Sequence, residues 1–185
     1  EQYSALKLPE GLDTQVFEFL LDRFRAWYQA EGISAEVFQS VFQLKPTKPW
    51  DFNLRIRAVH RFSQLAEAQS LASANKRVSN ILQKQGDAAD ADSPVDPSLL
   101  KEPAEQQLAA TLEKCRLVAE PLFQRHEYTT GLEALAGSKQ AIDNFFEKVL
   151  VMDEDPVLRA NRITLLGALR TLFLQVADIS YLHQS

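Results

Sequence analysis

Residues 158–180 read LRANRITLLGALRTLFLQVADIS, and this run carries the clearest structural pattern in the chain. Its apolar residues recur at the three- and four-residue spacing of one α-helical stripe. The stripe consists of Leu158, Leu165, Leu169, Leu172 and Val176, widened by Leu166 and Phe173. A helix that is apolar around much of its circumference is typically buried, so we predict that it lies at the centre of a bundle. Asp155 and Pro156 fit its N-cap and first position, and we expect it to end near residue 178.

Helical spacing continues through most of the chain, and no stretch alternates apolar and polar residues over the length of a strand. We therefore predict an all-α fold, a helical bundle. The predicted helices span 13–32, a short segment after Ser34, a segment capped by Asp51, and then about 67–85, 103–126, 127–136, 138–150 and 156–178. The first is expected to bury a stripe made of Val16, Phe17, Leu20, Leu21, Phe24 and Tyr28.

Two segments organise this bundle. Residues 1–50 are predicted to form an N-terminal helical lead-in that packs on a helical domain of residues 51–185. Within that domain, residues 86–97 (GDAADADSPVDP) are polar, acidic and interrupted by Gly and Pro. We interpret them as a flexible acidic loop between two packed halves.

Composition narrows the class of protein. We find no signal peptide near the start and no apolar run of about 18 residues, so we expect no membrane partner. Cys115 is the only cysteine, which fits a reducing, cytoplasmic location, and with three scattered histidines it makes no usual zinc site. The abrupt ends suggest a piece of a longer protein.

Charge is unevenly distributed along a chain whose formal net charge is −5. Residues 45–86 hold eight Lys or Arg against Asp51 and Glu67, a balance of +6, whereas residues 87–113 hold seven acids against Lys101, a balance of −6. A polyanion responds to the local field within about 8–10 Å, not to the sum. The acidic total argues against nonspecific nucleic-acid coating, and we expect no DNA partner, while segment 45–86 can still bind a specific polyanion.

The segment ANKRVSNIL (74–82) is the most informative part of that basic region. On a helix, Arg77, Asn80 and Lys84 share the face opposite the apolar residues, and Asn75 and Lys76 are predicted to lie beside them. Cations suit phosphates, and carboxamides suit base edges. The alternative is an ordinary solvated helix face, and spacing alone slightly favours that alternative.

The helix that begins near Asp51 adds further candidates. Its arginines, Arg55, Arg57 and Arg61, are predicted to extend the same positive surface, and Trp50 beside them suits stacking on an unpaired base. Packing in the core or at a hinge is the alternative for the aromatic residues, and it is favoured for Phe52 over Trp50.

Catalytic patterns are missing from the sequence: we find no Gly-rich phosphate loop, no Gly-x-Ser-x-Gly turn and no His-Glu-x-x-His pair. The acids at 153–155 are better explained as a helix N-terminus. Arg162 is expected to pair with Asp143, Asp153 or Asp155, and for Arg159 a phosphate contact stays open. We predict a binding module without a catalytic centre.

Five segments together resemble the C-terminal region of the β chain of bacterial heterotetrameric glycyl-tRNA synthetase. They are FEFLLDRFRAWYQAEG (17–32), ANKRVSNIL (74–82), LKEPAEQQL (100–108), FFEKVLVM (145–152) and LRANRITLLGALRTLFLQVADIS (158–180). The resemblance implies a helical anticodon-binding domain of the type found in arginyl-tRNA synthetase. It also implies an α2β2 ligase that attaches glycine to its tRNA, with the smaller α chain as partner. ATP and Mg would act at a site outside this chain, which needs no cofactor of its own.

These observations give two hypotheses. In the first, the chain binds the anticodon stem-loop of glycine tRNA through Asn75, Lys76, Arg77, Asn80, Lys84, Arg55, Arg57, Arg61 and Trp50. In the second, the chain is a protein-interaction module that docks the β chain to its partner subunit. The aromatic residues Phe17, Phe24, Trp27 and Tyr28 of the first helix motivate the second hypothesis, because they exceed what one stripe must bury.

Overall fold

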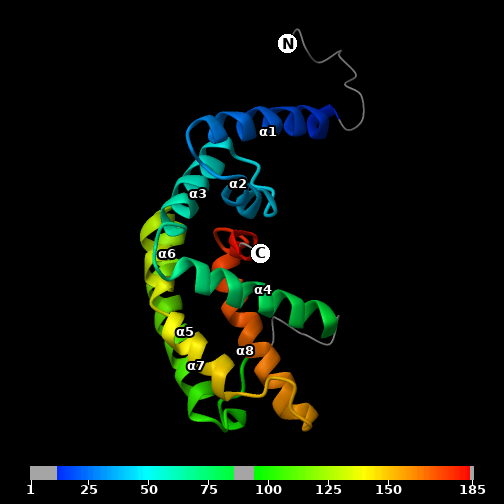
Figure 1. The fold of residues 1–185 in the computed structure, drawn as a ribbon, viewed down its shortest axis with the longest axis vertical. Coiled ribbons are helices and arrows are strands. Elements are labelled where there is room, and N and C mark those ends of the chain that lie inside the picture. The colour runs from blue at the N-terminus through cyan, green and yellow to red at the C-terminus, as the bar shows by residue number, and fades with distance from the viewer. Residues whose placement is uncertain (1–11, 86–93, 184–185) are drawn as a thin grey trace, which may run out of the picture.

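The computed structural model describes residues 12–85 and 94–183, and within them the chain is helical with no strand. The expected all-α fold is confirmed. Eight α-helices and two 3₁₀-helices follow one another in these ranges (Figure 1). They are α1 (Leu12–Ala30), α2 (Ala35–Phe42), α3 (Pro49–Phe62), α4 (Ala68–Gln85), η2 (Pro97–Leu99), α5 (Pro103–Gln124), α6 (Tyr128–Ala136), α7 (Lys139–Lys148), α8 (Pro156–Leu174) and η3 (Ile179–Leu182).

Helix α8 is the centre of the bundle, as its pattern predicts. It contacts α4, α5 and α6, and α4 crosses it in Figure 1. Asp155 caps its first turn by accepting a hydrogen bond from the backbone N–H of Val157 at 2.8 Å, and Pro156 occupies the first turn, where no N–H donor is needed. The helix ends at Leu174, about four residues earlier than predicted, and the chain turns into η3.

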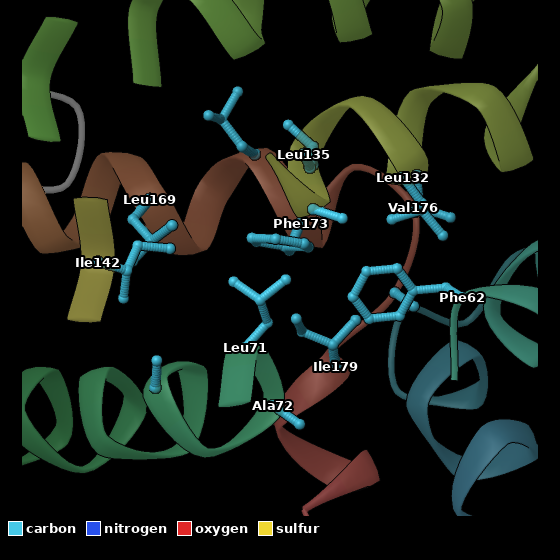
Figure 2. Packing of buried hydrophobic residues seen from close by; sticks show 14 of the residues in the cluster. Phe62, Leu71, Ala72, Leu132, Leu135, Ile142, Leu169, Phe173, Val176 and Ile179 are labelled. Carbon is cyan, nitrogen blue, oxygen red and sulfur yellow. The ribbon is translucent and has the colours of Figure 1, made fainter. Parts of the chain in front are cut away.

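The core joins both halves of the chain around α8. Figure 2 shows side chains from six elements meeting there: Phe62 of α3, Leu71 of α4, Leu132 and Leu135 of α6, Ile142 of α7, Leu169 and Phe173 of α8, and Ile179 of η3. All of these side chains are buried. Burying a side chain of this size contributes roughly 1.5–3 kcal/mol. The expectation that the two halves pack together is therefore confirmed.

Helix α1 departs from the prediction. Its C-terminal end packs on α2 and buries Tyr28, whereas its N-terminal half extends beyond the other helices in Figure 1. Val16 and Leu20 of the predicted buried stripe are exposed, and so is Phe19, at 59%. The prediction therefore holds only for the C-terminal part of the stripe, where Tyr28 is buried and Phe24 is half-buried against the core. The side chains of Phe17 and Leu21 lie outside the described residues.

The structure changes the predicted start of one helix and describes only part of the acidic loop. Helix α3 begins at Pro49, not at Asp51, because the fixed backbone angle of proline suits the first helical turn. Of the acidic loop 86–97, residues 86–93 lie outside the described residues. Asp96 at its end is anchored, since its backbone N–H donates to Asn161 Oδ1 at 2.8 Å and its carbonyl accepts from Asn161 Nδ2 at 3.0 Å. The division between residues 1–50 and 51–185 stays a prediction.

Candidate nucleic-acid interface

Helix α4 presents four of the predicted side chains to solvent. Lys76, Arg77, Asn80 and Lys84 are all exposed, and their spacing of three and four residues places them on one side of the helix. We call these four residues the α4 face. Among the described residues, no carboxylate pairs with its three cations. The α4 face therefore carries positive charge together with one carboxamide.

Arg77 is positioned by a neighbouring helix. Its guanidinium carbon lies 4.3 Å from the ring centroid of Phe146, a half-buried residue of α7. A cation–π contact of this kind contributes about 0.5–1 kcal/mol at an exposed site. The contact limits the rotamers of Arg77 without neutralising its charge, so the planar donor group stays suited to a phosphate.

Asn75 does not belong to the α4 face. It is 1% exposed, and its Nδ2 donates to the carbonyl oxygen of Leu71 at 3.0 Å. The prediction that Asn75 lies beside the outward cations is wrong. The physical reason is its position four residues after Leu71 and three before Val78, which places it on the buried side. Its amide is satisfied within the helix and is not available to a ligand.

Arg55 is an internal cation. Its Nε donates to Asp51 Oδ2 at 2.7 Å, its Nη1 to the carbonyl oxygen of Gln175 at 2.6 Å, and its Nη2 to the hydroxyl of Tyr128 at 3.1 Å. These bonds tie α3 to the start of α6 and the end of α8. The prediction that Arg55 extends an open positive surface is wrong, because its donors are already used.

The carboxylate of Asp51 organises the cluster around Arg55. The hydroxyl of Tyr128 donates to Asp51 Oδ1 at 2.5 Å, and His126 Nδ1 lies 2.9 Å from the Tyr128 hydroxyl oxygen. Burial opposes ionisation of Asp51, but the hydrogen bonds from Tyr128 and Arg55 outweigh it and hold the pKa of Asp51 below its ordinary value. Burial, followed by the bond to Asp51, raises the pKa of Tyr128 to about 12, so Tyr128 stays a neutral donor at pH 7.

The other two arginines of α3 are exposed but paired. Arg57 forms an ion pair with Glu31, and Arg61 Nε lies 3.0 Å from Glu133 Oε1 of α6. Arg57 and Arg61 thus face α1 and α6, whereas Arg77 faces α7. We predicted that the cations of α3 and α4 form one surface. The structure does not bring them together. Exposed pairs contribute only about 0–1 kcal/mol, so a phosphate can still compete for Arg57 or Arg61.

Trp50 lies at the start of α3, and its side chain is 60% exposed. Its ring meets the ring of His126 edge-on, with centroids 4.9 Å apart. Phe52, by contrast, is buried against Phe38 and Tyr28. An indole that stays exposed beside a polar cluster can stack on an unpaired base.

Comparison with protein-family models assigns residues 71–180 to the DALR anticodon-binding domain, and this range covers more than half of the 185 residues. The chain belongs to this family. All four residues of the α4 face lie inside the matched range. Arg55, Arg57, Arg61 and Trp50 precede it, so the DALR domain is preceded here by α1, α2 and α3.

Similarity to other proteins extends toward the N-terminus, beyond the range of the DALR domain. The chain is 49% identical to the glycine–tRNA ligase beta subunit of Chromohalobacter salexigens over 183 residues, 99% of this chain and 26% of that protein. It is 53% identical to the beta subunit of Edwardsiella ictaluri over 168 residues, 91% of this chain and 24% of that protein. The chain thus spans about a quarter of the length of these relatives, and the family resemblance inferred from the sequence is confirmed.

Sequence reasoning missed part of the polar framework of the DALR domain. Arg162 pairs with Asp153 at 2.6 Å, one of the three partners expected, but it is also buried and pairs with Glu105 at 2.5 Å. Arg159 donates to the carbonyl oxygen of Asp153 at 2.8 Å. A buried acid at the start of α5 gave no signal in the sequence, because it sits in a helix-capping pattern typical of surface positions.

The described residues hold neither a metal-binding cluster nor a helix able to span a membrane. Within residues 12–85 and 94–183, no three His, Cys, Asp or Glu side chains gather in a way that could hold a metal ion. In the same part of the chain, no helix combines the length and apolar character needed to cross a bilayer.

Proposed function

We propose that this chain is the anticodon-binding part of the beta subunit of a glycine–tRNA ligase, and that the α4 face contacts the tRNA. The observation that carries the proposal is the position of the α4 face: exposed cations and a carboxamide stand on one helix inside the range that matches the DALR anticodon-binding domain. The relatives named as glycine–tRNA ligase beta subunits support glycine tRNA as the ligand.

The roles within the α4 face follow from its chemistry. Lys76, Arg77 and Lys84 supply charge for phosphates and set the register of the RNA. Asn80 supplies a donor and an acceptor for a base edge, and anticodon bases expose those edges because the loop is unstacked. The two cytosines shared by glycine anticodons are the proposed targets. The domain thus acts through binding energy and orientation, while bond formation takes place elsewhere.

The proposal extends to the whole enzyme. An α2β2 assembly with a smaller α chain, with ATP and Mg acting at a site outside this chain, would place the reacting end of the tRNA on another part of the complex. Charging of tRNA also favours the cytoplasm as its location.

A binding titration tests the anticodon-binding proposal in the complete protein in which this chain occurs. Glycine tRNA and a version with a swapped anticodon are titrated at several salt concentrations. We expect tighter binding of the native tRNA. Lys76→Gln and Arg77→Gln should each lower the salt slope by about 0.7, the value for one phosphate contact on a single strand.

Lys114→Gln is the matched control, since Lys114 is an exposed lysine on a different helix, α5. Equal affinity for the two tRNAs would defeat anticodon reading. Wild-type salt slopes for both Lys76→Gln and Arg77→Gln would remove the α4 face from the site.

A second candidate function rests on α1. Val16, Phe19, Leu20 and Trp27 are exposed on this helix, more apolar side chains than a solvated helix usually presents. This surface would suit docking of the β chain to its partner subunit. Co-elution of the α chain with wild-type protein, and its loss with Phe19→Ser, would favour this role. Unchanged co-elution would exclude it.

A further inference from the structure

A pocket beside Trp50 gathers cationic side chains from segments far apart in the sequence. Its volume is about 540 Å³, within the range of about 300–1,000 Å³ typical of small-ligand sites. It lies between the turn before α3, the start of α6 and the end of α8. Its polar walls are Lys45, Lys48, Asp51, Arg55, His126 and Tyr128. We call it the Trp50 pocket.

The balance of charge in the Trp50 pocket favours an anion. Asp51 is its only carboxylate, and that carboxylate already accepts hydrogen bonds from Arg55 and Tyr128. Lys45 and Lys48 are exposed, and neither pairs with a carboxylate of the described residues. Asp51 and Arg55 offset each other, so Lys45 and Lys48 leave a net positive field in which a phosphate is favoured.

Two residues that line the Trp50 pocket have a positive backbone angle φ. Lys45 and His126 are the only non-glycine residues with positive φ in the described part of the chain, at 48° and 60°. Both line the Trp50 pocket. His126 directly follows α5, where its N–H donates to the carbonyl oxygen of Phe123 at 3.0 Å and the N–H of Glu127 donates to that of Leu122 at 2.9 Å, the hydrogen-bond pattern of a left-handed helix C-cap. Lys45 follows the end of α2, and its N–H donates to the carbonyl oxygen of Phe42 at 3.0 Å. Two helix ends therefore turn the chain at this pocket and bring Lys45 and His126 to its wall.

Trp50 adds an aromatic platform at the rim. Its indole is 60% exposed and touches His126, a wall of the pocket, edge-on. A positive groove beside an exposed aromatic ring is the arrangement with which proteins bind single-stranded nucleic acid. An acidic peptide would use the lysines but would not need the indole.

We propose that the Trp50 pocket binds one unstacked nucleotide of the bound tRNA, with its base on Trp50 and its phosphate on Lys45 and Lys48. The proposal rests on the function proposed above and adds a second contact. Lys45, Lys48 and Trp50 precede residues 71–180, so this contact lies outside the range matched to the DALR domain and apart from the α4 face.

Crosslinking locates the contact directly. The complete protein is irradiated with ultraviolet light in complex with glycine tRNA, and the crosslinked peptides are mapped. We expect a crosslink in the peptide that contains Trp50. Crosslinks confined to α4, or a crosslink from Trp50 to protein alone, would overturn the pocket while leaving the anticodon function in place.

Substitutions measure its contribution to affinity. Trp50→Leu should weaken tRNA binding by about fivefold to a hundredfold, the range for loss of one stacked base, and Trp50→Phe should keep most of the affinity. Lys48→Gln should lower the salt slope by about 0.7. The matched controls are Tyr181→Leu, another exposed aromatic residue, and Lys114→Gln, and both should bind as wild type.

Two outcomes separate this pocket from the anticodon proposal. Wild-type affinity and salt slope in both Trp50→Leu and Lys48→Gln would overturn the pocket, whatever the anticodon dependence. If wild-type protein binds native and anticodon-swapped tRNA equally but Trp50→Leu weakens both, the nucleotide pocket is supported and anticodon reading fails.

Discussion

Replacing Arg162 should destabilise the bundle more than any exposed arginine, because it leaves a carboxylate buried without its cation. Glu105 is 0% exposed, and it accepts from Arg162 Nε at 2.5 Å. Arg162 also donates to Asp153 Oδ2 at 2.6 Å and to the carbonyl oxygen of Leu150 at 2.8 Å. In Arg162→Met, the backbone N–H of Glu102 at 2.7 Å is the donor that remains for Glu105.

The expected loss from Arg162→Met is about 3–5 kcal/mol in the free energy of unfolding, the usual cost of breaking a buried ion pair from one side. Neutralising the stranded acid should recover part of that loss. The double variant Arg162→Met/Glu105→Gln keeps an acceptor for the Glu102 N–H and removes the buried charge. It should therefore be more stable than Arg162→Met alone, so the two substitutions are strongly non-additive.

Urea unfolding, followed by circular dichroism, measures both values. Arg116→Met is the control, because Arg116 bridges Glu113 and Glu120 on the surface of α5 and should lose only about 0–1 kcal/mol. Glu105 is expected to become a buried, unpaired charge in Arg162→Met. A double variant that is less stable than Arg162→Met, with losses that add, would refute this expectation.

Two shorter predictions concern packing and pH. Gly131→Ala should cost about 1–3 kcal/mol in thermal unfolding, since a Cβ there would stand 2.2 Å from Cε1 of Phe123, and a wild-type melting temperature would contradict this. Because the pKa of Asp51 is lowered in the fold, its stabilisation is present above the ordinary carboxyl pKa of about 3.9 and is lost as the pH falls through the lower folded value. Asp51→Asn should flatten the acid limb of stability against pH, and equal limbs would rule Asp51 out as a contributor.

Helix positions were predictable because local chemistry determines them. Ser34 accepts from the Val37 N–H at 3.4 Å, and Asp155 caps α8, and in both places the cap and the apolar spacing agree. The side of α4 that faces solvent was also predictable for Lys76, Arg77, Asn80 and Lys84. The position of Asn75 differs from the prediction because a carboxamide can be buried when its donor is satisfied, here by the carbonyl oxygen of Leu71.

Contacts between distant segments were not predictable, and they decide which candidates are available. Apart from Asp51 on the same helix, the partners of Arg55 lie at Tyr128, Gln175 and Val176, more than 70 residues away along the chain, so its spacing on α3 gives no hint of them. The exposed apolar residues of α1 are a second case in which the sequence did not reveal the contacts. Amphipathic spacing indicates an apolar side but does not say which segment covers it.

The balance of +6 over residues 45–86 overstates the positive surface of α3, because acids from other segments fold onto it. Glu31 and Glu133 lie outside that range yet pair with Arg57 and Arg61, and Asp51 pairs with Arg55. Since fields are screened over about 8–10 Å, a phosphate near α3 meets these pairs instead of three free cations.

The cations of residues 45–86 that have no described carboxylate partner lie in two places, the α4 face and the lysines of the Trp50 pocket. Salt dependence should follow the same division. Neutralising an arginine of α3 also leaves its partner carboxylate unpaired. We therefore expect it to change the number of phosphate contacts little. Neutralising Lys76, Arg77 or Lys48 removes a cation that no described carboxylate offsets. We therefore expect the RNA contacts where charge is uncompensated in space, not where basic residues are dense along the sequence.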